Sequence, residues 1–403
     1  MSSSVPRERI VLYAALTALT AVSIDALLPG LRDIAGELGV APPLSTQHVV
    51  TLFIFGMVFG ELVFGPISDA VGRKRALVAG LGVYAIGTLV ALLASSLEGV
   101  ILGRVLQGIG VAGPKIATRA MIRDQFEGEA MARVMSFLFS LFILVPMIAP
   151  ALGQGVIALA GWRGMFTLYL ILALGLGAWL VMRQPETLPP ERRIPFRPRI
   201  LLANGARILT NRRVALLIMA TGFVFGAQLL YLSIAADLFA DAYGVRETFP
   251  IYFAMLAAGI GLASYLNGRF VGRFGMDAMA RFGFLGLTLA GLFMLAASIA
   301  YDGRPPLAFL LLSGFGAFFA IGILFGNLNA MAMRLLGEVA GLGASLIASG
   351  SSLVATLFAI GLGTLYDGTV MVLAGGIFLA GAVSLLLGGL SSRGSDKPVM
   401  AVR

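Results

Sequence analysis

The stretch FGPISDAVGRKRAL, residues 64–77, places one acid and three bases between two long apolar runs. These runs cover residues 46–67 and 75–95, and each is long enough to cross the roughly 30 Å hydrocarbon core of a bilayer as a helix. A short polar segment between two such runs is typical of a helical hairpin in a membrane. The stretch therefore predicts a membrane protein whose helices are joined by short charged loops.

The composition of the whole chain agrees with this prediction. Hydrophobic residues make up 59% and charged residues 12% of the sequence, and the mean hydropathy is +0.95. Continuous apolar runs of this length indicate helices and not the alternating strands of a membrane barrel. We expect an all-α membrane protein with twelve transmembrane helices, at 9–28, 46–67, 75–95, 98–120, 132–158, 163–182, 214–236, 247–268, 279–301, 305–332, 340–366 and 369–390.

The distribution of Lys and Arg predicts the orientation in the membrane. Most of them fall on one side, in the loops at 73–75, 183–213 and 269–273 and near both chain ends, including Arg393 and Lys397. The other side has only Arg32, Arg163, Arg246 and Arg304. Because cytoplasmic loops carry the excess of basic residues, both termini are predicted to be cytoplasmic. The same loops account for the net charge of +9 without nucleic-acid binding.

A polar segment at 183–213 separates the first six spans from the last six. We expect an N-terminal six-helix bundle at 1–182, a cytoplasmic linker at 183–213 and a C-terminal bundle with a short tail at 214–403. A weak repeat supports pseudo-symmetric bundles, since Gly65, Asp69 and Gly72 match Gly268, Gly272 and Gly275 at an offset of 203. The same offset relates Asp25 to Gln228.

The linker has two open interpretations. Residues 199–209, RILLANGARIL, fit a short helix on the membrane surface, with Ile200, Leu201, Ile208 and Leu209 facing inward. A disordered tether is the alternative.

The charges of the opening stretch suggest a conformational latch. Asp69 lies where a helix leaves the membrane, so its carboxylate can pair with Arg73 or cap the N-terminus of a neighbouring helix. Such a contact breaks when the neighbour moves away. The alternative is that Arg73, Lys74 and Arg75 only orient the protein and that Asp69 offsets them.

Several motifs resemble those of a known family. Gly65, Asp69, Gly72, Arg73 and Lys74 are similar to the G-x-x-x-D-x-x-G-R-[RK] loop of the major facilitator superfamily. Further stretches resemble its drug/proton antiporter branch with twelve spans, and within it the Bcr/CflA-type multidrug exporters; these are SIDALLPGL at 23–31, LGRVLQGIGVAG at 102–113, TRAMIRDQF at 118–126, VPMIAPALGQ at 145–154, GWRGMF at 161–166 and PETL at 185–188. The resemblance implies two bundles, alternating access, and helix-packing roles for Gln107, Gly108, Pro146, Pro150 and Gly153.

Charges within the spans are functional candidates because hydrocarbon makes them costly. Asp25 lies 16 residues beyond Arg9, about 24 Å along its helix, and Arg104 lies about 9 Å below the outer surface, so the two share a depth. We expect an Asp25–Arg104 pair in which the proton affinity of the acid depends on the distance of the cation, which is a basis for proton coupling. A static pair that fixes helix packing is the alternative. Lys115 departs from the family pattern, and we expect its side chain to reach the headgroups in preference to binding an anion.

A substrate cavity would be lined by polar and aromatic residues in the middle of the spans. The candidates are Tyr13, Phe225, Gln228, Tyr231, Phe325, Asn327 and Asn329.

Other chemistries lack support in the sequence. There is no cysteine, no phosphate-binding GxxxxGK[ST] loop, no HExxH and no paired catalytic carboxylates. Gly108, Gly110 and Gly113 spell GxGxxG, but inside a predicted membrane helix this spacing serves helix packing. We expect neither an enzyme nor a cofactor or metal.

The sequence thus predicts a proton-coupled secondary transporter that exports small amphipathic compounds, including drugs. Its partners would be a small-molecule substrate, protons and membrane lipid, with no nucleic acid. The expected form is a monomer, as is usual in the family, in a bacterial inner membrane. A dedicated transporter of one metabolite, such as a sugar, an amino acid or a siderophore, is the alternative, and a non-transporting receptor or scaffold is a third possibility.

Overall fold

The computed structural model describes residues 7–126, 128–336 and 340–392; within 128–143 it describes the side chains of residues 131, 134 and 138 only. Arg393 and Lys397 lie outside the described residues. All regular structure within these ranges is helical. By contact the chain divides into two compact units, Met1–Arg197 and Pro198–Arg403.

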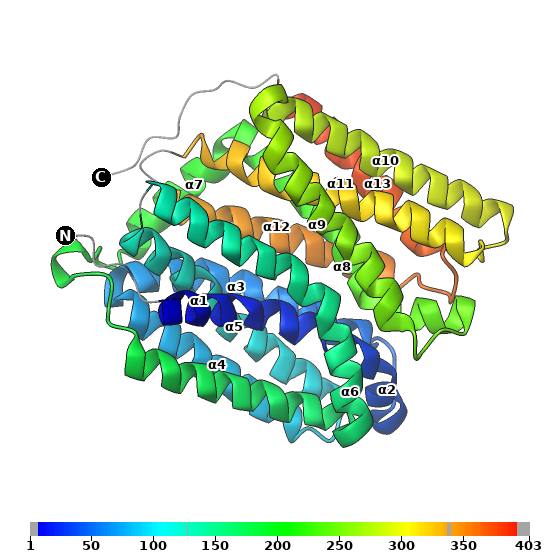
Figure 1. Cartoon of the computed structure of the whole chain (residues 1–403), viewed down its shortest axis with the longest axis horizontal. Helices are drawn as coiled ribbons and strands as arrows, with labels where there is room; N and C mark the ends of the chain where they lie inside the picture. The colour runs from blue at the N-terminus through cyan, green and yellow to red at the C-terminus, as the bar shows by residue number, and fades with distance from the viewer. Residues whose placement is uncertain (1–6, 127, 337–339, 393–403) are drawn as a thin grey trace. The chain divides into compact units, whose positions relative to one another are not determined.

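Unit 1 contains the first group of helices (Figure 1). They are α1 (Arg7–Asp25), the 3-10 turn η1 (Leu28–Gly30), α2 (Leu31–Leu38), α3 (Gln47–Val71), α4 (Arg73–Leu92), α5 (Leu97–Gln125), α6 (Gly128–Arg183) and the turn η2 (Pro190–Arg192). The short α2 was not predicted from the sequence.

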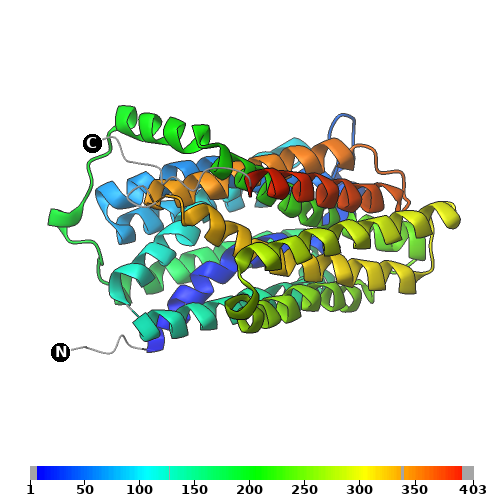
Figure 2. The same ribbon diagram turned by 90° about the horizontal axis from the view of Figure 1, so that it is seen from above.

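Unit 2 contains the remaining helices. They are α7 (Pro198–Thr210), α8 (Arg212–Tyr243), α9 (Phe249–Phe274), α10 (Met276–Ala300), α11 (Leu307–Met333), α12 (Ala340–Gly363) and α13 (Met371–Ser391). α8 packs against α11, α12 and α13, and α10 packs against α11 and α13. Seen from the front and from above, α10 and α11 run side by side (Figures 1 and 2).

Eleven of the described helical segments are long and apolar enough to cross a membrane, one fewer than the twelve predicted spans. The difference lies in α6, which contains both the 132–158 and the 163–182 runs. Gly161 interrupts it with φ 65° and ψ −179°. Beyond this kink, Arg163 contacts Glu37 of α2 and Arg183 contacts Glu8 of α1, so the second part of α6 runs antiparallel to α1. The two predicted spans are therefore joined by one non-helical residue, and no separate loop divides them.

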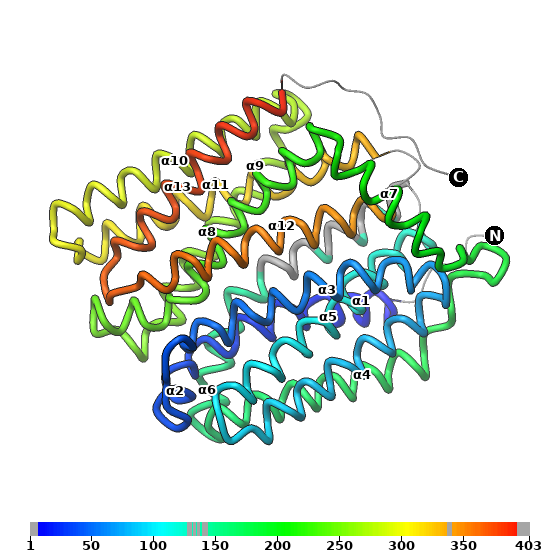
Figure 3. Tube along the Cα trace, turned by 180° about the vertical axis from the view of Figure 1, so that it is seen from behind, coloured from blue at the N-terminus to red at the C-terminus, as the bar shows by residue number. Residues whose placement is uncertain are grey.

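Small residues determine the packing of unit 1. α3 and α5 run parallel, and a Cβ built at Gly56 or Gly60 would collide with the carbonyl of Val105 or Ile109. A Cβ at Gly108 of α5 would likewise collide with the carbonyl of Phe53. The two backbones touch because these positions lack side chains. The expected packing residue Gly108 lies at this contact, and Figure 3 shows α3 beside α5 from behind.

The segment expected as the linker is ordered on both sides of the unit boundary. Residues up to 197 belong to unit 1, and α7 packs against α8 and α12 in unit 2. The tether interpretation is wrong for α7, which is helical. Ile208 is buried, as are Asn204 and Gly205, whereas Leu209 is exposed.

Candidate functional site

Asp25 is the last residue of α1 and is 5% exposed. Pro29 lies in the 3-10 turn that follows, where its missing N–H and fixed φ prevent the α-helix from continuing. On α6, a Cβ at Gly153 would collide with the carbonyl of Ala26, so the backbone of α6 lies directly against the residue after Asp25. Pro146 and Pro150 lie in α6 within the two turns before this contact. The structure thus places the expected packing residue Gly153 beside the expected coupling acid.

Arg104 of α5 is fully buried and is held mainly by α3. Its Nε donates to the carbonyl of Val49 at 3.0 Å, and its guanidinium lies 4.1 Å from the centre of the Phe53 ring. Nη1 donates to Oε1 of Gln107 at 2.8 Å. The expected ion pair between Arg104 and Asp25 is not formed in the part of the chain that the structure describes. The close approach of α3 and α5 at Gly108 explains this, since it brings a carbonyl and an aromatic ring to the guanidinium.

Arg104 keeps one donor available. Its Nη2 is buried and has no hydrogen-bond partner among the described residues. Leaving a buried donor unpaired costs about 1–3 kcal/mol, so an arriving acceptor would bind it strongly.

Two tyrosines that the sequence analysis did not select hold the end of α1. The hydroxyl of Tyr84 in α4 lies 2.6 Å from Oγ of Ser23, and Tyr169 in α6 donates to the carbonyl of Val22 at 3.2 Å. Tyr169 is also near enough to interact with the charges of both Arg104 and Asp25. Both tyrosines lie in apolar runs. The same feature led to the choice of Tyr13 and Tyr231 as cavity candidates and could have identified these two as well.

Gln107 connects the arginine to α4. It accepts from Arg104, and its Nε2 donates to Oγ1 of Thr88 at 2.7 Å. All three side chains are buried. The amide therefore fixes the rotamer of Arg104 in a polar chain that runs from α3 through α5 to α4.

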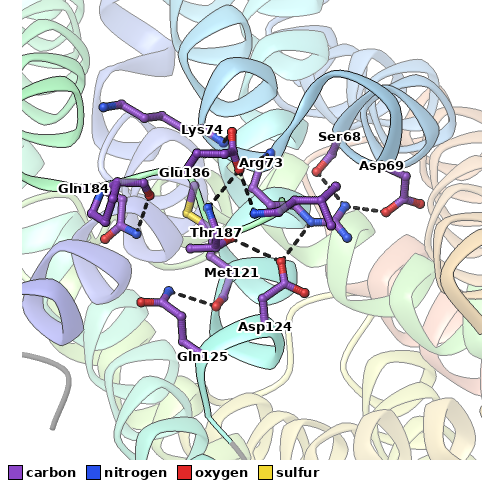
Figure 4. Close-up of polar contacts among 12 residues, drawn as sticks. Ser68, Asp69, Arg73, Lys74, Met121, Asp124, Gln125, Gln184, Glu186 and Thr187 are labelled. Carbon is purple, nitrogen blue, oxygen red and sulfur yellow. Dashed lines mark hydrogen bonds and ion pairs between the residues drawn. The ribbon is translucent and has the colours of Figure 1, made fainter. Parts of the chain in front are cut away.

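The loop between α3 and α4 forms a second polar cluster (Figure 4). Arg73 pairs with Asp69 one turn before it and with Oδ2 of Asp124 in α5 at 3.2 Å, and it donates to Oγ of Ser68 at 3.1 Å. The side chain of Arg73 is 7% exposed, and that of Asp69 is 31% exposed. Of the two contacts expected for Asp69, the structure shows the pairing with Arg73. Gly65 lies one turn earlier on α3.

Glu186 caps the N-terminus of α4, a role the sequence analysis did not assign. Its Oε1 accepts from the backbone N–H of Arg73 at 2.9 Å, and its Oε2 accepts from that of Lys74 at 3.1 Å. Gly72 has φ 107° and ψ 152°, and a Cβ there would collide with Glu186. The side chain of Lys74 turns away and donates to the carbonyl of Val181 at 2.9 Å. Glu186 was visible in the sequence only within the PETL stretch.

Lys115 does not reach toward the headgroups, so that expectation is wrong. Its Nζ lies 2.5 Å from Oε1 of Glu61 in α3, and the Glu61 side chain is 0% exposed. Glu61 was missed although it interrupts an apolar run, which was the usable signal.

The cavity candidates are divided between the two units. Tyr13 is in unit 1 and accepts from Gln125 at 2.5 Å; the others are in unit 2. Tyr231 is buried between the rings of Phe253 and Phe318, and Phe225 lies edge-on to Phe325. Asn327 donates to Oδ1 of Asn267 at 2.7 Å and is buried. Gln228 is partly buried and Asn329 is exposed.

Known proteins resemble this chain over most of its length. It is 30% identical over 338 residues to the "Bicyclomycin resistance protein homolog" of Haemophilus influenzae, and the aligned region covers 83% of each chain. It is 28% identical to a "Chloramphenicol resistance protein" of Pseudomonas aeruginosa, over 75% of this chain and 71% of that one. It is 26% identical to the "Multidrug transporter MdfA" of Yersinia pestis, over 78% and 75%.

The fold has solved counterparts. The crystal structure of a D-xylose-proton symporter superposes with a TM-score of 0.77 over 98% of both chains, at 14% identity. Identity this low shows a shared fold only. The sequence model of the Major Facilitator Superfamily matches residues 13–359. This match, together with the 30% identity to a relative over most of both chains, shows that the chain is an integral membrane protein of the Major Facilitator Superfamily.

Proposed function

We propose that this protein exports small amphipathic compounds, drugs among them, in exchange for protons by alternating access. The observation that carries the proposal is a buried carboxyl, Asp25, and a buried arginine, Arg104, whose charges both act on Tyr169 while no ion pair joins them in the described part of the chain. A carboxyl in this setting is able to change its protonation state as its surroundings change.

Arg104 would stabilise the ionised state of Asp25. Its guanidinium contacts Val49, Phe53 and Gln107, while Nη2 has no hydrogen-bond partner among the described residues. A movement of the end of α1 toward α5 would give Asp25 a cation to pair with and would favour its release of a proton. Movement back, or entry of a substrate, would favour uptake. The substrate and the proton then compete for one conformational equilibrium, which is the condition for exchange.

The α3–α4 loop is suited to a latch. Arg73 is buried and has several partners, whereas Asp69 is partly exposed and has an accessible carboxylate edge. We infer that Asp69 changes partners as the transporter changes conformation, while Arg73, Asp124 and Glu186 keep the ends of α4 and α5 together. The location that fits this loop is the cytoplasmic side of a bacterial inner membrane, with both termini cytoplasmic.

The relatives favour drugs over a single nutrient. Three of them are named for resistance to bicyclomycin or chloramphenicol or for multidrug transport. The symporter for D-xylose is similar in fold at 14% identity and says nothing about the substrate here. Testing unrelated compounds one by one separates the two functions, because a dedicated transporter would accept one of them only.

The direct test replaces Asp25. In proteoliposomes with an imposed pH gradient, Asp25→Asn should lose gradient-driven export by at least about 100-fold, because the amide cannot carry the proton. Asp33→Asn is the matched control, since Asp33 is exposed on α2 eight residues further on. Binding of substrate by the Asp25→Asn protein would show that it is folded. Gradient-driven export at the wild-type rate by this variant would refute the proposed coupling.

A further inference from the structure

The Glu61–Lys115 pair lies deep within unit 1. α4 has 20 residues and so spans about 30 Å, the thickness of the hydrocarbon core, and it begins at Arg73. Arg73 contacts Asp124 of α5, so Asp124 marks the membrane boundary on that helix. Lys115 precedes Asp124 by nine residues, about 14 Å along the helix. The pair therefore lies about 14 Å from the boundary that Asp124 marks, and Lys115 has a carboxylate of the protein as its partner at that depth.

The two members of the pair differ in accessibility. The Glu61 side chain is 0% exposed, and the Lys115 side chain is 20% exposed. An approaching molecule meets the ammonium and not the carboxylate.

A second cation lies on the same face of α5. Arg119 follows Lys115 by four residues, so their side chains project from the same side of the helix. Arg119 is exposed and interacts with the charge of Glu61. Two cations near one acid leave this cluster with an excess positive charge, which the low dielectric constant of the surroundings makes costly.

The cluster is also held in place. Gly56, Gly60 and Gly108 bring the backbones of α3 and α5 into contact, which keeps the carboxylate opposite the ammonium. A rigid arrangement of this kind loses little entropy when a ligand binds.

We propose that Lys115, Arg119 and Glu61 form a binding site for the carboxylate of amphipathic substrates. Lys115 and Arg119 contact the anionic group, and Glu61 positions Lys115 from behind. The inference rests on the proposed export function, since it names a chemical class among the exported compounds.

The test compares two probes that differ in one charge, dansyl-phenylalanine and its methyl ester. Fluorescence titration of the purified protein in a neutral detergent gives the Kd of each. The carboxylate should bind at least about tenfold more tightly than the ester, as expected for a hydrogen bond to a charged group. Equal affinities of the wild-type protein for the two probes would overturn the proposal.

Variants show which residues cause the preference for the carboxylate probe over the ester. Glu61→Gln/Lys115→Gln keeps an uncharged polar pair between α3 and α5 and should lower the Kd ratio several-fold, with Arg119 retaining a smaller preference for the carboxylate. Glu61→Gln alone should raise the ratio, because it frees the ammonium, and Arg119→Gln should lower it several-fold. Arg123 is exposed and lies two turns beyond Lys115 on α5. Arg123→Gln removes the same charge as Arg119→Gln and should leave the Kd ratio unchanged. A Kd ratio left unchanged by the double substitution would refute the site.

Transport measured in parallel separates this inference from the proposed function. Selective binding without gradient-driven export of either probe would refute the function and leave the site standing. Equal export of both probes, with equal affinities, would refute the site and leave the proposed export function standing.

Discussion

The second and fourth membrane helices of each unit hold a polar contact, but its charge differs. In unit 1 it joins Glu61 of α3 to Lys115 of α5, and in unit 2 it joins Asn267 of α9 to Asn327 of α11. Both helix pairs pack through glycine, with Gly60 against Ile109 and Gly322 against Ile260. The packing is thus shared, and the ionisable groups are not.

The same contrast extends over the spans. The predicted spans of unit 1 contain Asp25, Glu61, Arg104, Lys115 and Arg119, whereas those of unit 2 have charged residues only near their ends, at Glu247 and Arg281. Gln228 stands at the position related to Asp25. The duplicated architecture therefore carries its charge chemistry in one half, and we expect substitutions in that half to have the larger effects on both stability and transport.

The largest expected difference is between the two interhelical contacts. Lys115→Gln removes the ammonium that pairs with the buried carboxylate of Glu61 and should lower the free energy of unfolding by about 3–5 kcal/mol, whereas Asn327→Ala should lower it by about 1–3 kcal/mol. Unfolding in mixed micelles by a denaturing detergent measures both. Glu61→Gln/Lys115→Gln turns the first contact into the neutral kind and should restore most of the loss. Equal losses for the two single variants would break the comparison.

A smaller difference is expected at the two helix-linking glycines. Gly72 and Gly275 both have positive φ, 107° and 82°, but only the position of Gly72 is crowded, by Glu186. Gly275→Ala should cost about 1–2 kcal/mol of backbone strain, and Gly72→Ala about 3 kcal/mol, because Glu186 must also leave its cap. The midpoints of the same unfolding curves report the order. A Gly275 variant less stable than the Gly72 variant would contradict the structure.

The smallest effect concerns the acids at the start of α4 and α10. Glu186→Gln weakens a cap that accepts from two backbone N–H groups and should cost about 1 kcal/mol. Asp277 lies in the first turn of α10, is 59% exposed and is 4.0 Å from Arg213. Asp277→Asn should change stability by less than about 0.5 kcal/mol. A rise in salt concentration should reduce the second effect more than the first, since screening acts on exposed charges.

The sequence sufficed to predict the spanning helices and the family. Runs of apolar residues are read directly because the bilayer requires each span to satisfy its own backbone hydrogen bonds. The predicted helix boundaries were wrong mainly in α6, where Gly161 takes the place of a loop. The short helix α2 was not predicted, because it has too few residues to form a recognisable apolar run. The candidates Asp25, Arg104, Asp69 and Arg73 were visible as charges in or beside apolar runs.

Which of these side chains meet was decided by the tertiary structure. Depth along the helices suggested that Arg104 would pair with Asp25, yet the contact of α3 with α5 gives it Val49 and Phe53 instead. Glu61 and Lys115 are 54 positions apart, and Glu186 lies 113 residues beyond Arg73. Helical periodicity determines the face of a residue within its own helix only. The partner across an interface depends on the rotation and approach of two backbones, which the glycines permit but do not specify until both helices are packed.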